Sequence, residues 1–163
     1  MTTRAQQLAA RIEQGADALA TFAHGLSDSQ WKTPVPGDGR LIGVIVHHVA
    51  SVYPIEVQLA AQLGSGAAIT GVTWAGIAEM NAGHAAEHAG ASKRETLELL
   101  HQRSREAASA VRTMTDAQLD SAAPVSLYGD APLTAQFMLE DHAVRHSWHH
   151  LARIRAALTA DYR

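Results

Sequence analysis

Histidine is the residue type in this sequence that is most able to do chemistry. The chain of 163 residues contains ten histidines and no cysteine. Two imidazoles in an HxxxH spacing lie one turn apart on one helical face, where both can bind the same metal ion. Chance placement of ten histidines in this length gives about 0.6 such pairs, whereas the sequence contains His84/His88, His142/His146 and His146/His150. The excess favours metal binding but does not select a pair.

Helical phase, taken at about 100° per residue, separates these histidines. His48 lies in the middle of an apolar stripe on the second predicted helix, whereas His47 points about 100° away from that stripe. In the last predicted helix, His146 and His150 lie on the flank of the apolar face, and His142 lies on the face expected to be wetter. The phase therefore selects His48, His146 and His150 as inward-facing residues.

An inward histidine needs either a hydrogen bond or a metal ion, because burying an unpartnered polar group is costly. For any single histidine, a hydrogen bond within the core is the simpler interpretation. Three inward histidines on two helices favour a shared metal ion. The competing pair, His84 and His88, shares a face with Ile77 and Met80, which we expect to turn inward. Two glycines interrupt that helix and make it a less rigid platform for ligands, so we place this pair second.

Two charged residues lie near the predicted site. Glu56 follows His48 by two turns and could orient a ligand or act as a fifth ligand. A carboxylate that reaches solvent near the end of the helix is the more common arrangement. Arg153 lies one turn beyond His150 and could hold an anionic substrate group, whereas a solvated arginine at a helix end is the default interpretation.

Composition excludes several classes of protein. The formal net charge is −3, which does not favour binding to nucleic acid or to an anionic membrane. The longest strongly apolar run, Leu41 to Val46, is far shorter than the roughly 20 residues of a membrane span, and no apolar secretion segment follows Met1. Without cysteine there is no disulfide, thiolate metal site or cysteine nucleophile. We expect a soluble, cytoplasmic protein with a small-molecule substrate.

The apolar spacing predicts an all-α fold. Alanine, the best helix former, is abundant, and helical stripes recur along the chain. Capping-box patterns at 27–30, 92–95 and 115–118 mark helix starts. In the last helix we place Phe137, Val144 and Trp148 at the centre of the inward arc. Pro54 lies inside the second helix, but the apolar phase continues across it and predicts one kinked helix. The expected helices are 4–25, 40–63, 74–89, 92–114 and 133–158.

These helices predict one four-helix bundle domain over residues 1–163, with the helix at 74–89 as an extra short helix between bundle helices 2 and 3. A faint internal repeat supports two similar helical hairpins, since a helix, a capping box, prolines and a His-bearing helix occur in that order twice. The alternative is that helix caps draw on few residue types and so look alike.

Several motifs resemble the DinB-like superfamily of bacterial four-helix bundles, which includes YfiT-like proteins and the N-terminal domain of the mycothiol-dependent maleylpyruvate isomerase. The resemblance rests on Trp31 with the proline-rich turn at 34–40, the segment LIGVIVHHVA at 41–50, Asn81, and the segment HSWHHLARI at 146–154. It implies that His48, His146 and His150 form the family's metal triad. The expected metal is zinc, nickel or iron, with open positions for water or substrate.

The same resemblance implies a metal-dependent transferase, isomerase or hydrolase. Some relatives use a low-molecular-weight thiol such as mycothiol, bacillithiol or glutathione. Because this chain has no cysteine, a thiol reaction would take its sulfur from such a small molecule. The alternative is a non-catalytic module that binds a metal or a small molecule. Bundles of this size often pair, so we also expect a homodimer.

Overall fold

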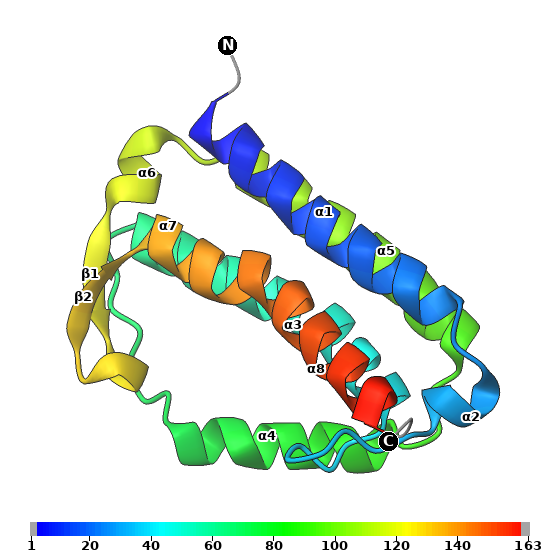
Figure 1. Cartoon of the computed structure of the whole chain (residues 1–163). Coiled ribbons are helices and arrows are strands. Elements are labelled where there is room, and N and C mark those ends of the chain that lie inside the picture. Colours follow the sequence, from blue (N-terminus) through cyan, green and yellow to red (C-terminus); the bar gives the residue numbers. More distant parts are fainter. Residues whose placement is uncertain (1–2, 161–163) are drawn as a thin grey trace.

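Four long helices carry most of the apolar residues of the chain. The computed structural model describes residues 3–160 (Figure 1). The bundle helices are α1 (Arg4–His24), α3 (Ile42–Gly64), α5 (Lys93–Arg112) and a last helix that runs through α7 (Ala135–Met138), the π-helical segment η2 (Leu139–Val144) and α8 (Arg145–Ala160). The connections contain α2 (Asp28–Trp31), α4 (Trp74–Glu87), α6 (Asp116–Asp120), β1 (Ala122–Val125), the 3-10 turn η1 (Ser126–Tyr128) and β2 (Ala131–Thr134).

The bundle is held together by small and branched apolar side chains. Helix α5 packs against both α1 and α3, and the last helix packs against α1 and α3. Ala9, Ala16 and Ala23 on α1 are fully buried, which lets neighbouring backbones approach closely. Ile12 and Leu19 fill the space between them. The structure therefore confirms the predicted all-α four-helix bundle.

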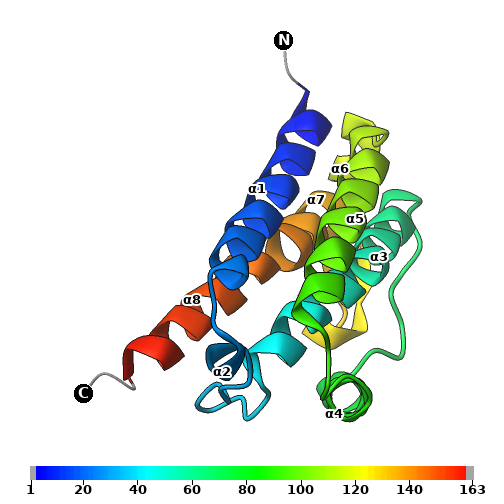
Figure 2. The same cartoon turned by 90° about the vertical axis from the view of Figure 1, so that its right-hand side faces the viewer.

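Helix α4 is attached to this bundle rather than part of it. It is the extra short helix predicted between the second and third bundle helices, and it lies on the side of α3 and α8 that faces away from α1 and α5 (Figure 1). Figure 2 shows α4 end-on. None of its residues is buried by the rest of the described chain. Ile77 is only half-buried and Met80 remains 46% exposed, so the prediction that both turn inward is wrong for Met80.

Helix boundaries follow the predicted capping signals closely. Ser27 and Thr115 both form complete capping boxes, each with the glutamine three residues later. At Ser92 the side chain accepts the Glu95 N–H, but the reciprocal bond is absent among the described residues. Pro54 lies within one continuous helix, as predicted.

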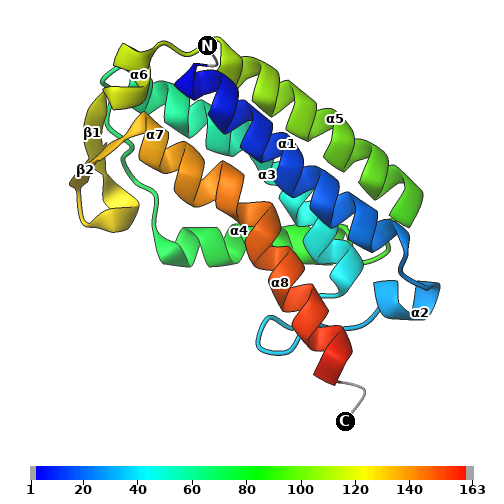
Figure 3. The same ribbon diagram turned by 45° about the horizontal axis from the view of Figure 1, so that its top comes forward.

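The last helix differs from the prediction in two respects. It starts at Ala135 rather than at Leu133, because the residues before it form the antiparallel hairpin of β1 and β2, which the sequence analysis did not predict. Phe137 and Trp148 are 39% and 45% exposed rather than central to the core. The π-helical segment η2 has more residues per turn than an α-helix, so one 100° phase cannot describe both sides of it. Figure 3 shows this helix beside α1.

Helix α3 is the core helix of the bundle. Among the described helices it is the one long and apolar enough to cross a membrane, with a mean hydropathy of 1.3. However, 61% of its apolar window is buried inside the bundle, as expected for the core helix of a soluble protein.

The start of α3 provides the first testable prediction. Gly43 lies directly under the indole ring of Trp31, and a Cβ atom at this position would overlap that ring. Trp31 is 6% exposed and donates a hydrogen bond from Nε1 to the Ala91 carbonyl at 3.0 Å, so it cannot easily move. We expect Gly43→Ala to destabilise the protein by about 1–3 kcal/mol in urea unfolding.

The matched control is Gly83→Ala on α4, where a Cβ atom would meet nothing within 4 Å. Because alanine is the better helix former, this change should leave stability unchanged or raise it slightly. Equal stabilities of the two variants would show that Trp31 does not restrain Gly43.

Candidate metal centre

Three histidines from two bundle helices converge at one point. His48 is on α3, and His146 and His150 are one turn apart on α8. We call these residues the first triad. The ring centroids of His48 lie 5.1 Å from His146 and 5.7 Å from His150, and those of His146 and His150 are 4.8 Å apart. One ring nitrogen from each lies within 4.8 Å of the others. The structure thus brings together the residues that helical phase selected.

The surroundings of the first triad are largely closed to solvent. His48 and His150 are 6% and 5% exposed. His48 follows the apolar stripe of α3, where Ile45 and Val49 are fully buried, so the core itself places the imidazole. The first triad combines rigid helical platforms with three nitrogen donors, which is what a zinc-type site with an open coordination position requires.

Glu56 supports the first triad from α3. Its Oε1 lies 2.7 Å from Nδ1 of His146, and the carboxylate is 5% exposed. A carboxylate that accepts the Nδ1 proton fixes the tautomer and leaves Nε2 free to bind a metal ion. The more common arrangement considered for Glu56, a charge reaching solvent, is therefore wrong. Glu56 orients His146 instead.

Two histidines of the first triad, His48 and His150, are in environments that favour their neutral form. Burial, reinforced by His146 and Arg40, lowers the pKa of His48 to about 3. Burial and the same neighbours, with His48, also lower the pKa of His150 well below its usual value. Neutral imidazoles keep the lone pairs that a metal ion needs. The buried Nδ1 of His150 has no hydrogen-bond partner among residues 3–160, so hydrogen bonding alone does not satisfy the first triad.

These depressed pKa values predict acid sensitivity of the metal-free protein. An unfolded histidine titrates near pH 6.5, whereas folded His48 and His150 titrate much lower. As the pH falls below 6.5, the unfolded chain binds protons that the folded chain does not, so stability decreases. We expect the free energy of unfolding to fall from pH 7 to pH 5 by up to about 1.4 kcal/mol per pH unit for each such histidine.

The measurement is urea unfolding of chelator-treated protein at several pH values. Removing both groups in His48→Gln/His150→Gln should flatten the slope in this range. An unchanged slope would place the acid sensitivity elsewhere.

A cavity of about 590 Å³ opens beside the first triad. Its walls come from α3, α4, the β1–β2 hairpin and the last helix, and His48, Glu56, His146 and His150 all line it. Most of the other lining side chains are apolar. This volume is in the range of small-molecule sites.

The polar part of the cavity wall includes residues that sequence reasoning missed. The Tyr128 hydroxyl donates to Asp141 Oδ2 at 2.8 Å and lies 3.0 Å from His142 Nε2. Burial and Asp141 raise the pKa of Tyr128 to about 12, so it stays protonated. Tyr128 reaches the cavity only because the unpredicted hairpin folds back over α3, and no local pattern marks it.

Arg153 does not reach toward the cavity. Its Nη1 lies 3.3 Å from Asp38 Oδ2, and Asp38 also accepts two hydrogen bonds from the guanidinium of Arg40. These bonds to Arg40 lower the pKa of Asp38. Arg153 is thus neither a solvated helix-end arginine nor a residue of the cavity wall, whereas Arg40 does line the cavity. The Nη1 atom of Arg40 has no hydrogen-bond partner among the described residues, so this guanidinium has a donor available.

His84 and His88, the second candidate pair, do not join the first triad. They lie instead beside His47, the histidine that phase placed away from the apolar stripe of α3. Residues 3–160 therefore contain two clusters of three histidines rather than one.

Comparison with known proteins agrees with the geometry. The model of the DinB superfamily matches residues 11–154. The chain belongs to the DinB superfamily. This result confirms the resemblance found in the sequence.

One solved structure similar to this member of the DinB superfamily is YfiT from Bacillus subtilis, described as a probable metal-dependent hydrolase with an unusual four-helix bundle topology. The TM-score is 0.74, with 20% sequence identity, and the match covers 96% of this chain and 88% of YfiT. At this identity the likeness establishes the fold alone. No curated protein matches the chain.

Proposed function

We propose that this DinB-superfamily chain is a metal-dependent enzyme whose first triad binds one divalent ion of zinc, nickel or iron. The observation that carries the proposal is the convergence of His48, His146 and His150 on the wall of a cavity large enough for a small molecule. All-imidazole donors suit these metals rather than magnesium or calcium.

The bound ion would act as a Lewis acid, polarising a carbonyl group and lowering the pKa of a bound water or thiol. The protein's own residues then have separate tasks. Glu56 holds the ring of His146 in one orientation through its 2.7 Å hydrogen bond. The apolar walls of the cavity exclude water from the reacting groups, and Arg40 offers a donor to an anionic substrate group.

Hydrolysis of a small carbonyl substrate is the reaction we favour. It needs only water as co-substrate, and the structurally similar YfiT is described as a probable metal-dependent hydrolase. The second candidate is transfer or isomerisation with a low-molecular-weight thiol, for which the cavity has room as a co-substrate. Because the chain has no cysteine, the sulfur in such a reaction would come from that small molecule. A cytoplasmic location and a homodimer remain predictions.

The test is turnover by protein reconstituted with zinc, nickel or iron. A panel of esters, lactones and amides is assayed with and without glutathione, mycothiol or bacillithiol. We expect hydrolysis without thiol, lost on treatment with a chelator and restored by metal. Turnover only with thiol would instead support the transferase or isomerase. Stoichiometric metal binding without any turnover would support a non-catalytic metal-binding module.

A further inference from the structure

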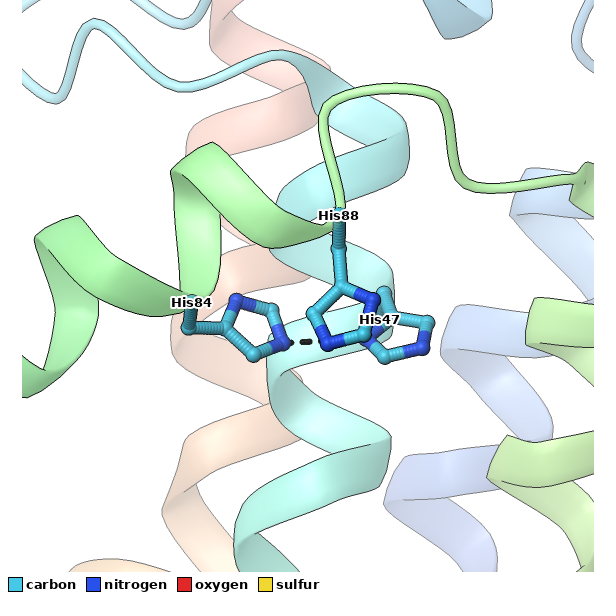
Figure 4. Close-up of side chains that lie close together, drawn as sticks. All are labelled: His47, His84 and His88. Atoms are coloured by element: carbon cyan, nitrogen blue, oxygen red, sulfur yellow. Dashed lines mark hydrogen bonds between the residues drawn. The ribbon is translucent and has the colours of Figure 1, made fainter.

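A second cluster of imidazoles lies between α3 and α4. It consists of His47 on α3, His84 on α4 and His88, the residue that caps the end of α4, and we call it the second triad (Figure 4). His47 Nδ1 lies 2.9 Å from His84 Nε2. The rings of His47 and His88 stack with centroids 3.9 Å apart, and those of His84 and His88 are 4.6 Å apart. One nitrogen of each residue lies within 4.8 Å of the others.

The second triad has the same composition as the first. Each takes one histidine from α3 and an HxxxH pair from another helix. His47 and His48 are neighbours in sequence, so their side chains leave α3 about 100° apart and serve different clusters. The rings of His48 and His84 are 5.6 Å apart, edge to face, so the two clusters are adjacent. They are distinct because their ring nitrogens gather in two separate groups of three.

Hydrogen bonding does not account for the second triad. The bond between His47 and His84 requires one of the two nitrogens to be unprotonated, so the pair is not doubly charged. Ser51 Oγ lies 3.2 Å from His47 Nδ1, on the nitrogen that already faces His84. The buried Nδ1 of His84 has no partner within residues 3–160. The carboxylate nearest to His88, Glu87, is 3.9 Å away and 77% exposed, which makes it a weak counter-charge.

A metal ion would satisfy these groups with little movement. Tetrahedral positions around zinc at 2.0–2.1 Å are about 3.4 Å apart. The facing nitrogens of His47 and His84 are already 2.9 Å apart, so they need to separate by only about 0.5 Å to share one ion. His88 stacks beside them from the end of α4 and supplies the third donor.

Helix α4 gives such an ion a structural task. No residue of this helix is buried by the rest of the described chain, so little apolar packing holds it against α3. Yet Trp74, Ile77, Met80 and Asn81 form one wall of the cavity beside the first triad. A metal ion bound by His47 on α3 and by the two histidines of α4 would hold that wall in position.

We propose that His47, His84 and His88 bind a second divalent transition-metal ion, which fastens α4 to α3 and so holds the wall of the cavity in place. This site does not depend on which reaction the cavity supports. Imidazole-only donors select zinc, nickel or copper over magnesium and calcium.

The first test counts zinc ions per chain in untagged protein, by titration against a chromophoric chelator. We expect two ions for the wild type and one for His84→Gln/His88→Gln, whose substitutions lie on the exposed helix and spare the bundle core. The variant His146→Gln/His150→Gln should also bind one ion, since it keeps the second triad. The matched control His24→Gln/His101→Gln removes two histidines outside both triads and should bind two.

The same number of ions in His84→Gln/His88→Gln as in the wild type would overturn the second site. The failure of the proposed function has a different signature, because it would leave His146→Gln/His150→Gln with the wild-type number of ions. The two proposals can therefore fail separately.

Hydrogen exchange of the amides in α4 tests whether the ion fastens this helix, which a count of bound ions does not test. Zinc binds only while α4 is docked on α3, so it should make any opening of α4 that breaks the site rarer. When the free zinc concentration is 100 times the dissociation constant, such openings should become up to about 100-fold rarer. We expect zinc to slow exchange in α4 of the wild type and of His146→Gln/His150→Gln, but not of His84→Gln/His88→Gln. Unchanged exchange in wild-type α4 on adding zinc would contradict the proposed fastening.

Discussion

The triple variant His48→Gln/His146→Gln/His150→Gln is expected to lose the ion of the first triad completely while retaining the helical bundle. Structural zinc sites contribute apparent binding free energies of about 10–16 kcal/mol, nearly all of it from their ligands. No third set of donors in residues 3–160 replaces the first triad, because the other three-histidine cluster has its own ligands. The measurement is elemental analysis of untagged protein, with circular dichroism to confirm helicity.

The matched control removes histidines that lie outside both clusters. His24 is exposed at the end of α1, and His101 lies 3.5 Å from the exposed Asp17. The double variant of these residues should keep its metal and its activity. If the triple variant contains as much metal per chain as this control, the ion is bound elsewhere and the first triad is a hydrogen-bonded core cluster.

The second large effect is expected from Glu56→Gln. The carboxylate holds the proton on Nδ1 of His146 at 2.7 Å, and this hydrogen bond both orients the ring and strengthens Nε2 as a donor. A neutral amide is a poorer acceptor and can also turn its NH2 group toward the ring. Metal affinity should fall by about 10–100-fold, the usual effect of removing such a supporting carboxylate.

The control for this experiment is Glu79→Gln on the exposed face of α4. It makes the same chemical change and should leave affinity unchanged. Metal affinity is measured by competition with a chelator, and the stability of the metal-free proteins is measured in parallel. If Glu56→Gln lowers only the stability of the metal-free protein, then Glu56 has a structural role and does not position a ligand.

The sequence contains most of what is needed to find the first triad. Apolar residues on α3 recur with helical spacing, so the direction of His48 follows from the residues around it. The HxxxH pair on α8 then shares one face by geometry alone. For the same reason, the bundle could be predicted: its helices are stabilised by apolar faces, and those faces are visible as stripes.

The second triad could not be predicted in this way. A helical wheel gives the direction of His47 relative to its own helix, but it does not say what packs against that polar flank. Helix α4 buries none of its own residues among the described ones, so no stripe reveals how it docks. The sequence offered Glu56 as a residue that could orient a ligand but favoured a solvent-exposed charge for a related reason, since its partner His146 lies 90 residues away.

The last helix illustrates a different limit. Leu139 and Ala143, on the flank of the predicted arc, are fully buried, whereas Phe137 and Trp148, at its centre, are exposed. The π-helical segment between them changes the phase, and no residue type marks such a segment. His146 and His150 are nevertheless placed correctly, since they lie on the flank that proves to be buried.

The most direct test of the metal centre is an anomalous difference map of zinc-loaded, untagged protein, from crystals measured on both sides of the zinc absorption edge. The geometry predicts a strong peak about 2.0–2.1 Å from one nitrogen each of His48, His146 and His150. Well-ordered density for these three side chains without an anomalous peak between them would contradict the proposed site.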